Sequence, residues 1–224
     1  MDFDAVIFDM DGVLVDSEPF YEARRCDFFE ALGISIAHLP HDFFVGGSLK
    51  QLWEVVLGED FVKFDKEEIA VFQARYEAYK DAHPLPYGDL LFPDAKETLE
   101  TLKKASLKLG LASSSRIQDI ARCLRECGLS GFFDSVLSGV DFPETKPNPA
   151  IYNKSLENVS VKSDRALIIE DSPKGIAAGK AAGATVWAVK SDNYPLNQSQ
   201  ADLVLPNLTA ITQKLSLSDA SKMC

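Results

Sequence analysis

Short runs of apolar residues alternate along most of this chain with longer segments in which apolar positions recur at helical spacing. The apolar runs predict six strands, at Ala5–Phe8, Leu107–Ala112, Ser135–Leu137, Ala166–Ile169, Thr185–Val189 and Asp202–Leu205. The amphipathic segments predict helices near 94–105, 116–127, 149–158, 173–182 and 207–215. Apolar strands that alternate with helices are typical of a parallel sheet covered on both faces. We therefore expect an α/β fold with a Rossmann-like, doubly wound core.

The stretch from about Glu18 to Ala82 interrupts this alternation. It has helical patterns around 18–32, 48–57 and 66–81 and no strand pattern. The turn-rich segment 81–88 then leads back toward the strands. We expect residues 17–83 to form an all-helical domain inserted after the first strand, and residues 1–16 and 84–224 to form the core.

Charge and hydropathy exclude several classes of function. Acidic residues outnumber basic ones by 34 to 23, for a net charge of −11, which disfavours nucleic acids and anionic membrane surfaces as partners. The first residues show no positively charged region before a long apolar run, and no segment reaches the roughly 18 apolar residues of a spanning helix. We expect a cytoplasmic protein without a membrane segment, and a monomer by default.

Polar residues follow four of the predicted strands. Open parallel sheets bind ligands beyond the carboxyl ends of their strands, so these positions are the first candidates for a site. In chain order they are Asp9-Met10-Asp11-Gly12, Ser113-Ser114-Ser115-Arg116, Thr145-Lys146-Pro147 and Glu170-Asp171-Ser172-Pro173.

Three of these carboxylates suit a divalent cation. Asp9 and Asp11 are two residues apart, and a chain reversal at Gly12 would turn Asp11 out of the strand. Carboxylates this close repel each other, and a cation relieves the repulsion. With Asp171 from another strand, the set is suited to Mg²⁺. An isolated Asp-x-Asp is otherwise a solvated turn.

A hydroxyl and a lysine at neighbouring strand ends suit a phosphate. Ser113 precedes a helix N-terminus, where free N–H groups favour an anion. Its alternative role is a plain helix cap, which Ser114 or Ser115 could also fill. Lys146, held in place by Pro147, offers a point charge for phosphate, and its alternative is a free surface lysine.

These motifs resemble those of a known family. The segments Asp9–Pro19, Leu111–Ser115, Thr145–Pro149 and Ile169–Ile176 are similar, in order and spacing, to the four motifs of the haloacid dehalogenase superfamily. The helical insertion after the first motif resembles the cap domain of the branch that contains phosphatases and β-phosphoglucomutase. The resemblance covers nearly the whole chain.

The resemblance implies roles for the core residues. Asp9 would be the nucleophile that forms an aspartyl-phosphate, and Asp11 the general acid and then the general base. Ser113, Ser114 and Lys146 would hold the transferring oxygens.

It also implies a metal and a moving cap. Mg²⁺ would be held by the carboxylates of Asp9 and Asp171 and the backbone carbonyl of Asp11, with Glu170 helping through water. The cap, residues 17–83, would open and close over the site. The substrate would be a small phosphorylated metabolite.

Several functions remain as alternatives. Tyr21 and Leu49 stand where a β-phosphoglucomutase would carry a histidine and a phosphate-binding arginine, which favours a phosphatase. Lys50 and Arg75 are still candidates for binding a second anion. The candidates for substrate selection are Tyr21, Arg24, Arg25, Lys50, Trp53 and Arg75. Each has an ordinary alternative as surface charge or cap core.

Two further classes fit less well. A dehalogenase of this fold needs neither the metal nor Asp11. A receiver domain, a non-enzymatic phospho-acceptor, needs only about half this length and no helical insertion. The sequence therefore predicts a Mg²⁺-dependent phosphatase.

Overall fold

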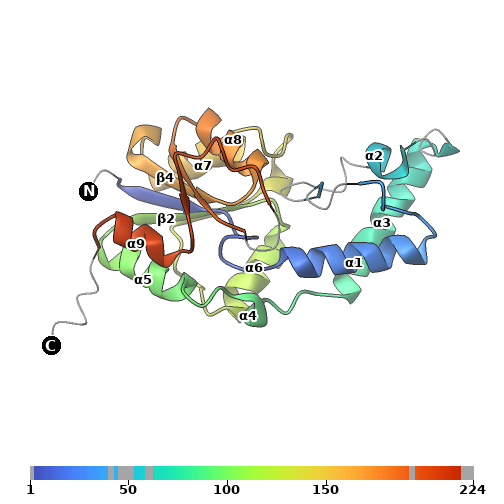
Figure 1. Ribbon diagram of the computed structural model, residues 1–224, viewed down its shortest axis with the longest axis horizontal. Coiled ribbons are helices and arrows are strands. Elements are labelled where there is room, and N and C mark those ends of the chain that lie inside the picture. The colour runs from blue at the N-terminus through green and yellow to red at the C-terminus, as the bar shows by residue number, and fades with distance from the viewer. Residues whose placement is uncertain (1–2, 40–42, 45–52, 59–62, 192–194, 218–224) are drawn as a thin grey trace.

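A six-stranded parallel sheet forms the centre of the larger part of the molecule (Figure 1). The computed structural model describes residues 3–39, 43–44, 53–58, 63–191 and 195–217. The strand order is β3-β2-β1-β4-β5-β6. The strands are β1 (Ala5–Phe8), β2 (Lys108–Ser113), β3 (Ser135–Ser138), β4 (Ala166–Glu170), β5 (Thr185–Val189) and β6 (Leu203–Leu205). Every predicted strand is confirmed to within one residue at each end.

Helices cover both faces of the sheet, as the continuous apolar strands predict. The core helices are α4 (Tyr87–Leu90), α5 (Ala95–Lys104), α6 (Ile117–Glu126), α7 (Ala150–Val159), α8 (Pro173–Ala181) and α9 (Thr209–Lys214), with short 3₁₀ helices η3 (Gly139–Asp141) and η4 (Ser163–Arg165). Val6 and Phe8 of β1 pack with α5, α6 and α9, whereas Ile7 packs with α7 and α8 on the other face. All three side chains are fully buried. The fold is an α/β, doubly wound one.

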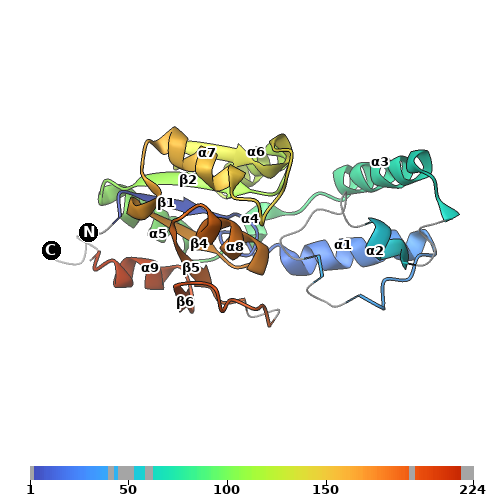
Figure 2. The ribbon, with the colours of Figure 1, turned by 90° about the horizontal axis from the view of Figure 1, so that it is seen from above.

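The segment between β1 and β2 is helical. It contains α1 (Glu18–Ala31), α2 (Trp53–Leu57) and α3 (Lys66–Ala82), and no strand occurs in its described part. Figures 1 and 2 show these helices together at one end of the molecule, beside the sheet domain. They have a core of their own, made of Phe28, Phe29, Phe44, Trp53, Val56, Leu57 and Tyr76. We call α1, α2 and α3 the helical lobe. Residues 48–52 of the expected helix 48–57 lie outside the described residues.

The return segment 81–88 is not wholly the linker that its prolines predict. Its first two residues belong to α3, which ends at Ala82, and its last two begin α4 at Tyr87. Tyr87 is almost fully buried, and its backbone carbonyl accepts a hydrogen bond from the thiol of Cys127. Packing against α6 thus stabilises a short helix where local sequence predicts a turn. None of the helices in the described ranges is long and apolar enough to cross a membrane.

The sheet order brings the candidate residues together. Because β2, β1 and β4 are adjacent and parallel, the residues at their carboxyl ends lie at the same edge of the sheet. Asp9 directly follows β1, and its backbone N–H donates to Ile169 O of β4 at 2.9 Å. The nucleophile candidate is therefore fixed in the middle of this edge.

Candidate active site

Lys146 and Asp9 form a buried ion pair at the centre of the site. The Lys146 ammonium donates to Asp9 Oδ1 at 2.7 Å, to Glu170 Oε1 at 2.7 Å and to Ala112 O at 3.0 Å. Burial alone would lower the pKa of Lys146, but the carboxylates of Asp9 and Glu170 outweigh it and hold that pKa well above its usual value. Lys146 is thus a fixed positive charge beside Asp9, and its binding of phosphate stays a prediction.

Glu170 holds Lys146 in place. Its Oε1 accepts from Lys146 and, at 2.6 Å, from the Tyr152 hydroxyl, while its Oε2 accepts from the backbone N–H groups of Asp171 and Ser172 and from the Ser172 hydroxyl. Burial would raise the Glu170 pKa, but Lys146 and these donors lower it. The carboxylate is fully buried and ionised. Its part in holding a metal through water stays a prediction.

Asp11 is oriented by two hydroxyl groups. Its Oδ1 accepts from Ser17 Oγ at 2.6 Å, and its Oδ2 accepts from Ser115 Oγ at 2.8 Å. Burial raises the pKa of Asp11, even though both hydroxyls stabilise its charged form. A carboxyl group with a raised pKa is suited to giving up a proton during a reaction. Sequence analysis did not assign this role to Ser17 or to Ser115.

The carboxylate of Asp171 is suited to binding a metal ion. Asp9, Glu170 and Asp171 each offer a carboxylate oxygen, and these oxygens lie within 4.8 Å of one another. Asp171 is 3% exposed, and its carboxylate accepts no hydrogen bond from the described residues. Burial and the charges of Glu170 and Asp9 raise the Asp171 pKa well above its usual value. A buried acid without a donor, next to two others, fits a divalent cation.

Ser113 lies beneath the loop that contains the other two serines. Its side chain is fully buried, and its hydroxyl accepts from the backbone N–H of Ser115 at 3.0 Å. Ser114 and Ser115, in contrast, line the cavity described below. Ser113 therefore orders this loop and does not cap α6, whose N-terminal cap residue is Arg116 without a side-chain hydrogen bond. Phosphate binding by Ser113 stays a prediction.

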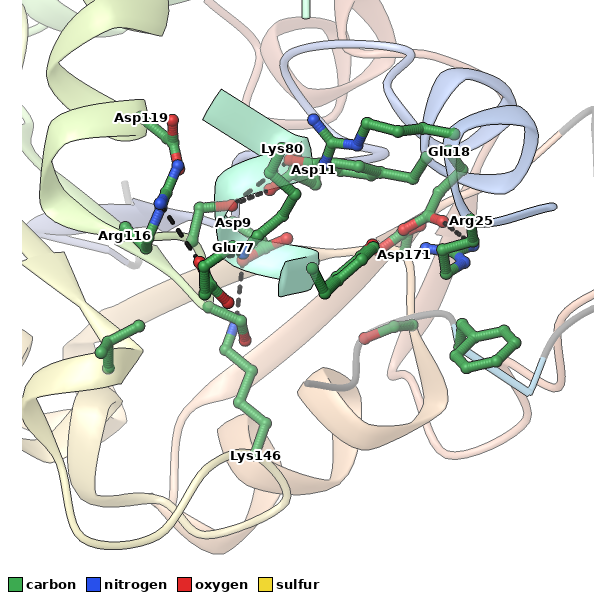
Figure 3. A pocket seen from close by; sticks show the side chains of 18 of the residues that line it. Asp9, Asp11, Glu18, Arg25, Glu77, Lys80, Arg116, Asp119, Lys146 and Asp171 are labelled. Atoms are coloured by element: carbon green, nitrogen blue, oxygen red, sulfur yellow. Dashed lines mark hydrogen bonds and ion pairs between the residues drawn. The ribbon is translucent and has the colours of Figure 1, made fainter. Parts of the chain in front are cut away.

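A cavity of about 410 Å³ opens between the sheet edge and the helical lobe (Figure 3). The core contributes the strand-end residues, and the lobe contributes residues of α1 and α3 and Phe44. Its lining residues are Asp9, Asp11, Glu18, Tyr21, Arg24, Arg25, Phe44, Gln73, Tyr76, Glu77, Lys80, Ser114, Ser115, Arg116, Asp119, Val140, Lys146, Asp171 and Ser172. The lobe and the catalytic candidates thus share one cavity.

Only some of the substrate-selection candidates reach this cavity. Tyr21, Arg24 and Arg25 line it, and their part in substrate selection stays a prediction. Trp53 does not, because it is buried in the lobe core, where its indole N–H donates to Gln73 Oε1 at 2.8 Å. Lys50, predicted to bind substrate, and Leu49 lie outside the described residues.

Arg75, predicted to bind substrate, is exposed and is not part of the cavity lining. On α3 the lining positions Gln73, Glu77 and Lys80 recur at helical spacing, and Arg75 falls on another face. Lys80 is the basic residue of α3 among those that line the cavity. It lies seven residues after Gln73 and therefore on the same face of the helix.

Arg116 connects the core with the lobe. It donates to Asp119 at 2.7 Å beside it on α6, to Glu77 at 3.1 Å and to Asp81 at 2.8 Å, the last two on α3. Tyr21 adds a longer contact, 3.5 Å between its hydroxyl and that of Ser115. These contacts hold α3 and α1 over the edge of the sheet.

Comparison with known proteins identifies relatives of the chain. The family model described as haloacid dehalogenase-like hydrolase matches residues 6–189. A phosphoglycolate phosphatase of Aquifex aeolicus is 31% identical over 202 residues, which are 89% of this chain and 91% of that protein. A phosphorylated carbohydrates phosphatase of Thermotoga maritima is 31% identical over 182 residues, 80% of this chain and 82% of that protein.

A solved structure gives the same fold. β-Phosphoglucomutase from Clostridium difficile superposes with a TM-score of 0.82 at 23% identity, over 96% of this chain and 95% of that one. At this identity the likeness concerns the fold alone. The family model, in contrast, spans all four motifs, from the strand before Asp9 to the end of β5. The chain therefore belongs to the haloacid dehalogenase-like hydrolases.

Proposed function

We propose that this hydrolase is a Mg²⁺-dependent phosphatase that transfers the phosphoryl group of a small phosphomonoester to Asp9 and then to water. The observation that carries the proposal is the position of Asp9, between the Lys146 ammonium at 2.7 Å and the buried carboxylate of Asp171. The named relatives, which are phosphatases of phosphoglycolate and of phosphorylated carbohydrates, support the reaction class.

In the first step a carboxylate oxygen of Asp9 attacks phosphorus, and the bond from phosphorus to the leaving oxygen breaks. Asp11 donates its proton to that oxygen, so the product leaves as a neutral alcohol. In the second step Asp11 takes a proton from water, and the water oxygen attacks the phosphorus of the aspartyl-phosphate. Asp9 is released as a carboxylate together with inorganic phosphate. Lys146 offsets the negative charge on the transferring oxygens throughout.

Asp9 and Asp171 are the residues that we propose for the metal, with the Asp11 backbone carbonyl and, through water, Glu170. When bound, Mg²⁺ supplies positive charge to the phosphoryl oxygens and orients them for in-line attack. Since the carboxylates around Asp9 outnumber Lys146, a dianionic substrate would meet net repulsion there without a cation.

We further propose that residues 17–83 form a cap domain that opens for substrate and closes for reaction. This rests on α1 and α3 lining the same cavity as Asp9, and on the contacts of Arg116 with α3. Closure would exclude bulk water and complete the substrate pocket. The monomeric state and the cytoplasmic location stay predictions.

A phosphomutase is the second candidate. Tyr21 lines the cavity where a mutase would place its histidine, and burial raises the pKa of its hydroxyl well above the usual value, so the phenol keeps its proton and does not act as a base. The acceptor of the phosphoryl group is therefore proposed to be water.

The test of the proposed function is phosphate release from a panel of phosphorylated sugars, polyols and small acids, with Mg²⁺ and with EDTA. We expect Mg²⁺-dependent release that Asp9→Asn abolishes, because an amide is not a competent nucleophile. Asp27→Asn, at an exposed position on α1, is the matched control. Undiminished activity in EDTA would contradict the metal assignment, and an active, folded Asp9→Asn protein would rule out Asp9.

A separate assay distinguishes the two candidates. The enzyme is given β-glucose 1-phosphate with a catalytic amount of the 1,6-bisphosphate, and glucose 6-phosphate and free phosphate are followed together. Glucose 6-phosphate that forms much faster than free phosphate would overturn the phosphatase assignment.

A further inference from the structure

The positively charged side chains that line the cavity differ in whether they already donate hydrogen bonds to carboxylates of the protein. Lys146 donates to Asp9 and Glu170, Lys80 lies 2.7 Å from Glu77, and Arg116 donates to three carboxylates. The charges of Lys146, Lys80 and Arg116 are therefore already paired with carboxylates of the protein.

Arg24 and Arg25 lie next to each other on α1 and differ in the same respect. Arg24 donates from Nη1 to the backbone carbonyl of His83 at 3.1 Å, although its Nε is buried without a hydrogen-bond partner among the described residues. The guanidinium of Arg25 donates no hydrogen bond to any of the residues that the structure describes. Arg25 is nonetheless only 8% exposed, and it lines the cavity. A buried guanidinium without an acceptor is costly unless a ligand supplies one.

Glu18 lies two turns before Arg25 on α1, on the same face of the helix, and it also lines the cavity. Arg25 Nη2 and Glu18 Oε2 form an ion pair at 3.8 Å, a distance too long for a hydrogen bond. The Glu18 oxygen has no hydrogen-bond partner among the described residues. Figure 3 shows the two side chains beside each other, near Asp171. This pair thus offers an unused donor and an unused acceptor in the same part of the cavity.

A hydroxyl group fits this pair better than a carboxylate does. An oxygen can lie about 2.8 Å from both groups, beside the 3.8 Å gap, accepting from Arg25 and donating to Glu18. A carboxylate could accept from Arg25 but has no proton to donate to the Glu18 oxygen, whereas a hydroxyl group does both.

Aromatic side chains form the neighbouring wall. Phe44 stacks under Arg25, with 4.7 Å from the guanidinium carbon to the ring centroid, and Tyr76 lies in the same wall. Aromatic faces bury the C–H groups of a carbon chain, while a few placed polar groups fix its hydroxyls.

We propose that Glu18 and Arg25 bind a hydroxyl group of the substrate's carbon chain, so that the enzyme acts on sugar or polyol phosphates in preference to short phosphocarboxylates. The proposal rests on the phosphatase function argued above. It makes the two residues determinants of specificity that act away from the phosphoryl group.

The first test uses the unaltered enzyme with Mg²⁺. Values of kcat/KM are measured for sorbitol 6-phosphate, glucose 6-phosphate and ribose 5-phosphate, for n-hexyl phosphate, which has a six-carbon chain without other hydroxyls, and for 2-phosphoglycolate. We expect the best hydroxylated substrate to exceed both n-hexyl phosphate and 2-phosphoglycolate by at least about 100-fold, because a site built to bind a hydroxyl discriminates strongly against its absence.

The second test uses variants. Arg25→Met and Glu18→Gln should each lower the ratio of kcat/KM for the best hydroxylated substrate over n-hexyl phosphate by about tenfold or more. The matched control is Arg125→Met, at an exposed position on α6 outside the cavity, which should leave the ratio unchanged. Thermal unfolding of each variant identifies those that are folded.

The results separate this inference from the proposed function. No phosphate release from any of these compounds would contradict the phosphatase function itself. Release with 2-phosphoglycolate or n-hexyl phosphate as good as the hydroxylated substrates, or an unchanged ratio in a folded Arg25→Met protein, would overturn the specificity proposal alone.

Discussion

Replacing Gly12 by alanine should displace Asp171 and weaken metal binding. Gly12 closes the turn after Asp11 with a φ of +76°. A Cβ atom at this position would lie 2.7 Å from Asp171 Cγ, with the carboxylate oxygen Oδ2 nearer still. Since Cβ atoms essentially never approach another heavy atom within 3.0 Å, Asp171 Cγ would have to retreat by at least 0.3 Å, which is 3.0 minus 2.7. The nearer oxygen would have to move farther.

Gly33 provides the matched control for backbone strain. It also has a positive φ, +67°, but a Cβ atom there would have no neighbour within 4 Å. Alanine at either position adds left-handed strain of about 1–2 kcal/mol. Any difference between Gly12→Ala and Gly33→Ala beyond that shared strain reports on the contact with Asp171.

We expect Gly12→Ala to lower kcat/KM about 100-fold, since a displacement of about 1 Å at a catalytic group has effects of that size. We also expect it to weaken Mg²⁺ binding about tenfold or more, measured by calorimetry on EDTA-treated protein. Gly33→Ala should stay close to wild type in both. Wild-type Mg²⁺ affinity and activity in Gly12→Ala, or an equal loss in Gly33→Ala, would refute the reasoning.

Three other outcomes follow from the same site. Tyr152→Phe removes the 2.6 Å bond to the Glu170 carboxylate and should lower the free energy of unfolding by about 1.5–3 kcal/mol; urea denaturation showing a loss below about 0.5 kcal/mol would contradict this. Arg116→Met removes the ion pairs with α3 and should increase the radius of gyration in X-ray scattering, whereas Arg125→Met should not. Burial raises the pKa of Glu18 from 4.5 to about 7, so the folded protein keeps a proton that the unfolded chain releases in this interval. Wild-type stability in EDTA should therefore fall relative to Glu18→Gln as pH rises from 4.5 to 7, by up to about 3 kcal/mol; a constant difference would contradict that pKa.

The sheet and the central residues of the site could be predicted from the sequence because their signals are local. The adjacent strands β1 and β4 contain the continuous apolar runs 5–8 and 166–169, and polar residues of the candidate site follow each run, Asp9 after the first and Glu170 and Asp171 after the second. In a parallel sheet the ends of neighbouring strands meet. A single local pattern therefore fixes both the fold and the edge at which these groups gather.

Side-chain orientation within the site could not be predicted in the same way. Three serines follow β2, and loop geometry alone decides that Ser113 is buried while Ser115 donates to Asp11. In the sequence of α7, Tyr152 lies on the apolar face and shows no sign of a polar role, although its hydroxyl donates to Glu170. On α3, Arg75 and Lys80 are equally basic, and only the helical phase relative to the cavity distinguishes them.

The buried charges of the site explain why its specificity must come from the lobe. At the sheet edge the polar side chains form hydrogen bonds with one another. Glu170 accepts from Lys146, Lys146 also donates to Asp9, and Ser115 donates to Asp11. Under the proposed function these residues act on the phosphoryl group, which every phosphomonoester shares, so they would not distinguish one substrate from another. Discrimination requires groups that touch the rest of the molecule and that no neighbour already satisfies. In the described part of the cavity, Arg25 and the Glu18 oxygen are such groups, because their 3.8 Å ion pair contains no hydrogen bond, and both lie on α1, which follows the strand that ends before Asp9.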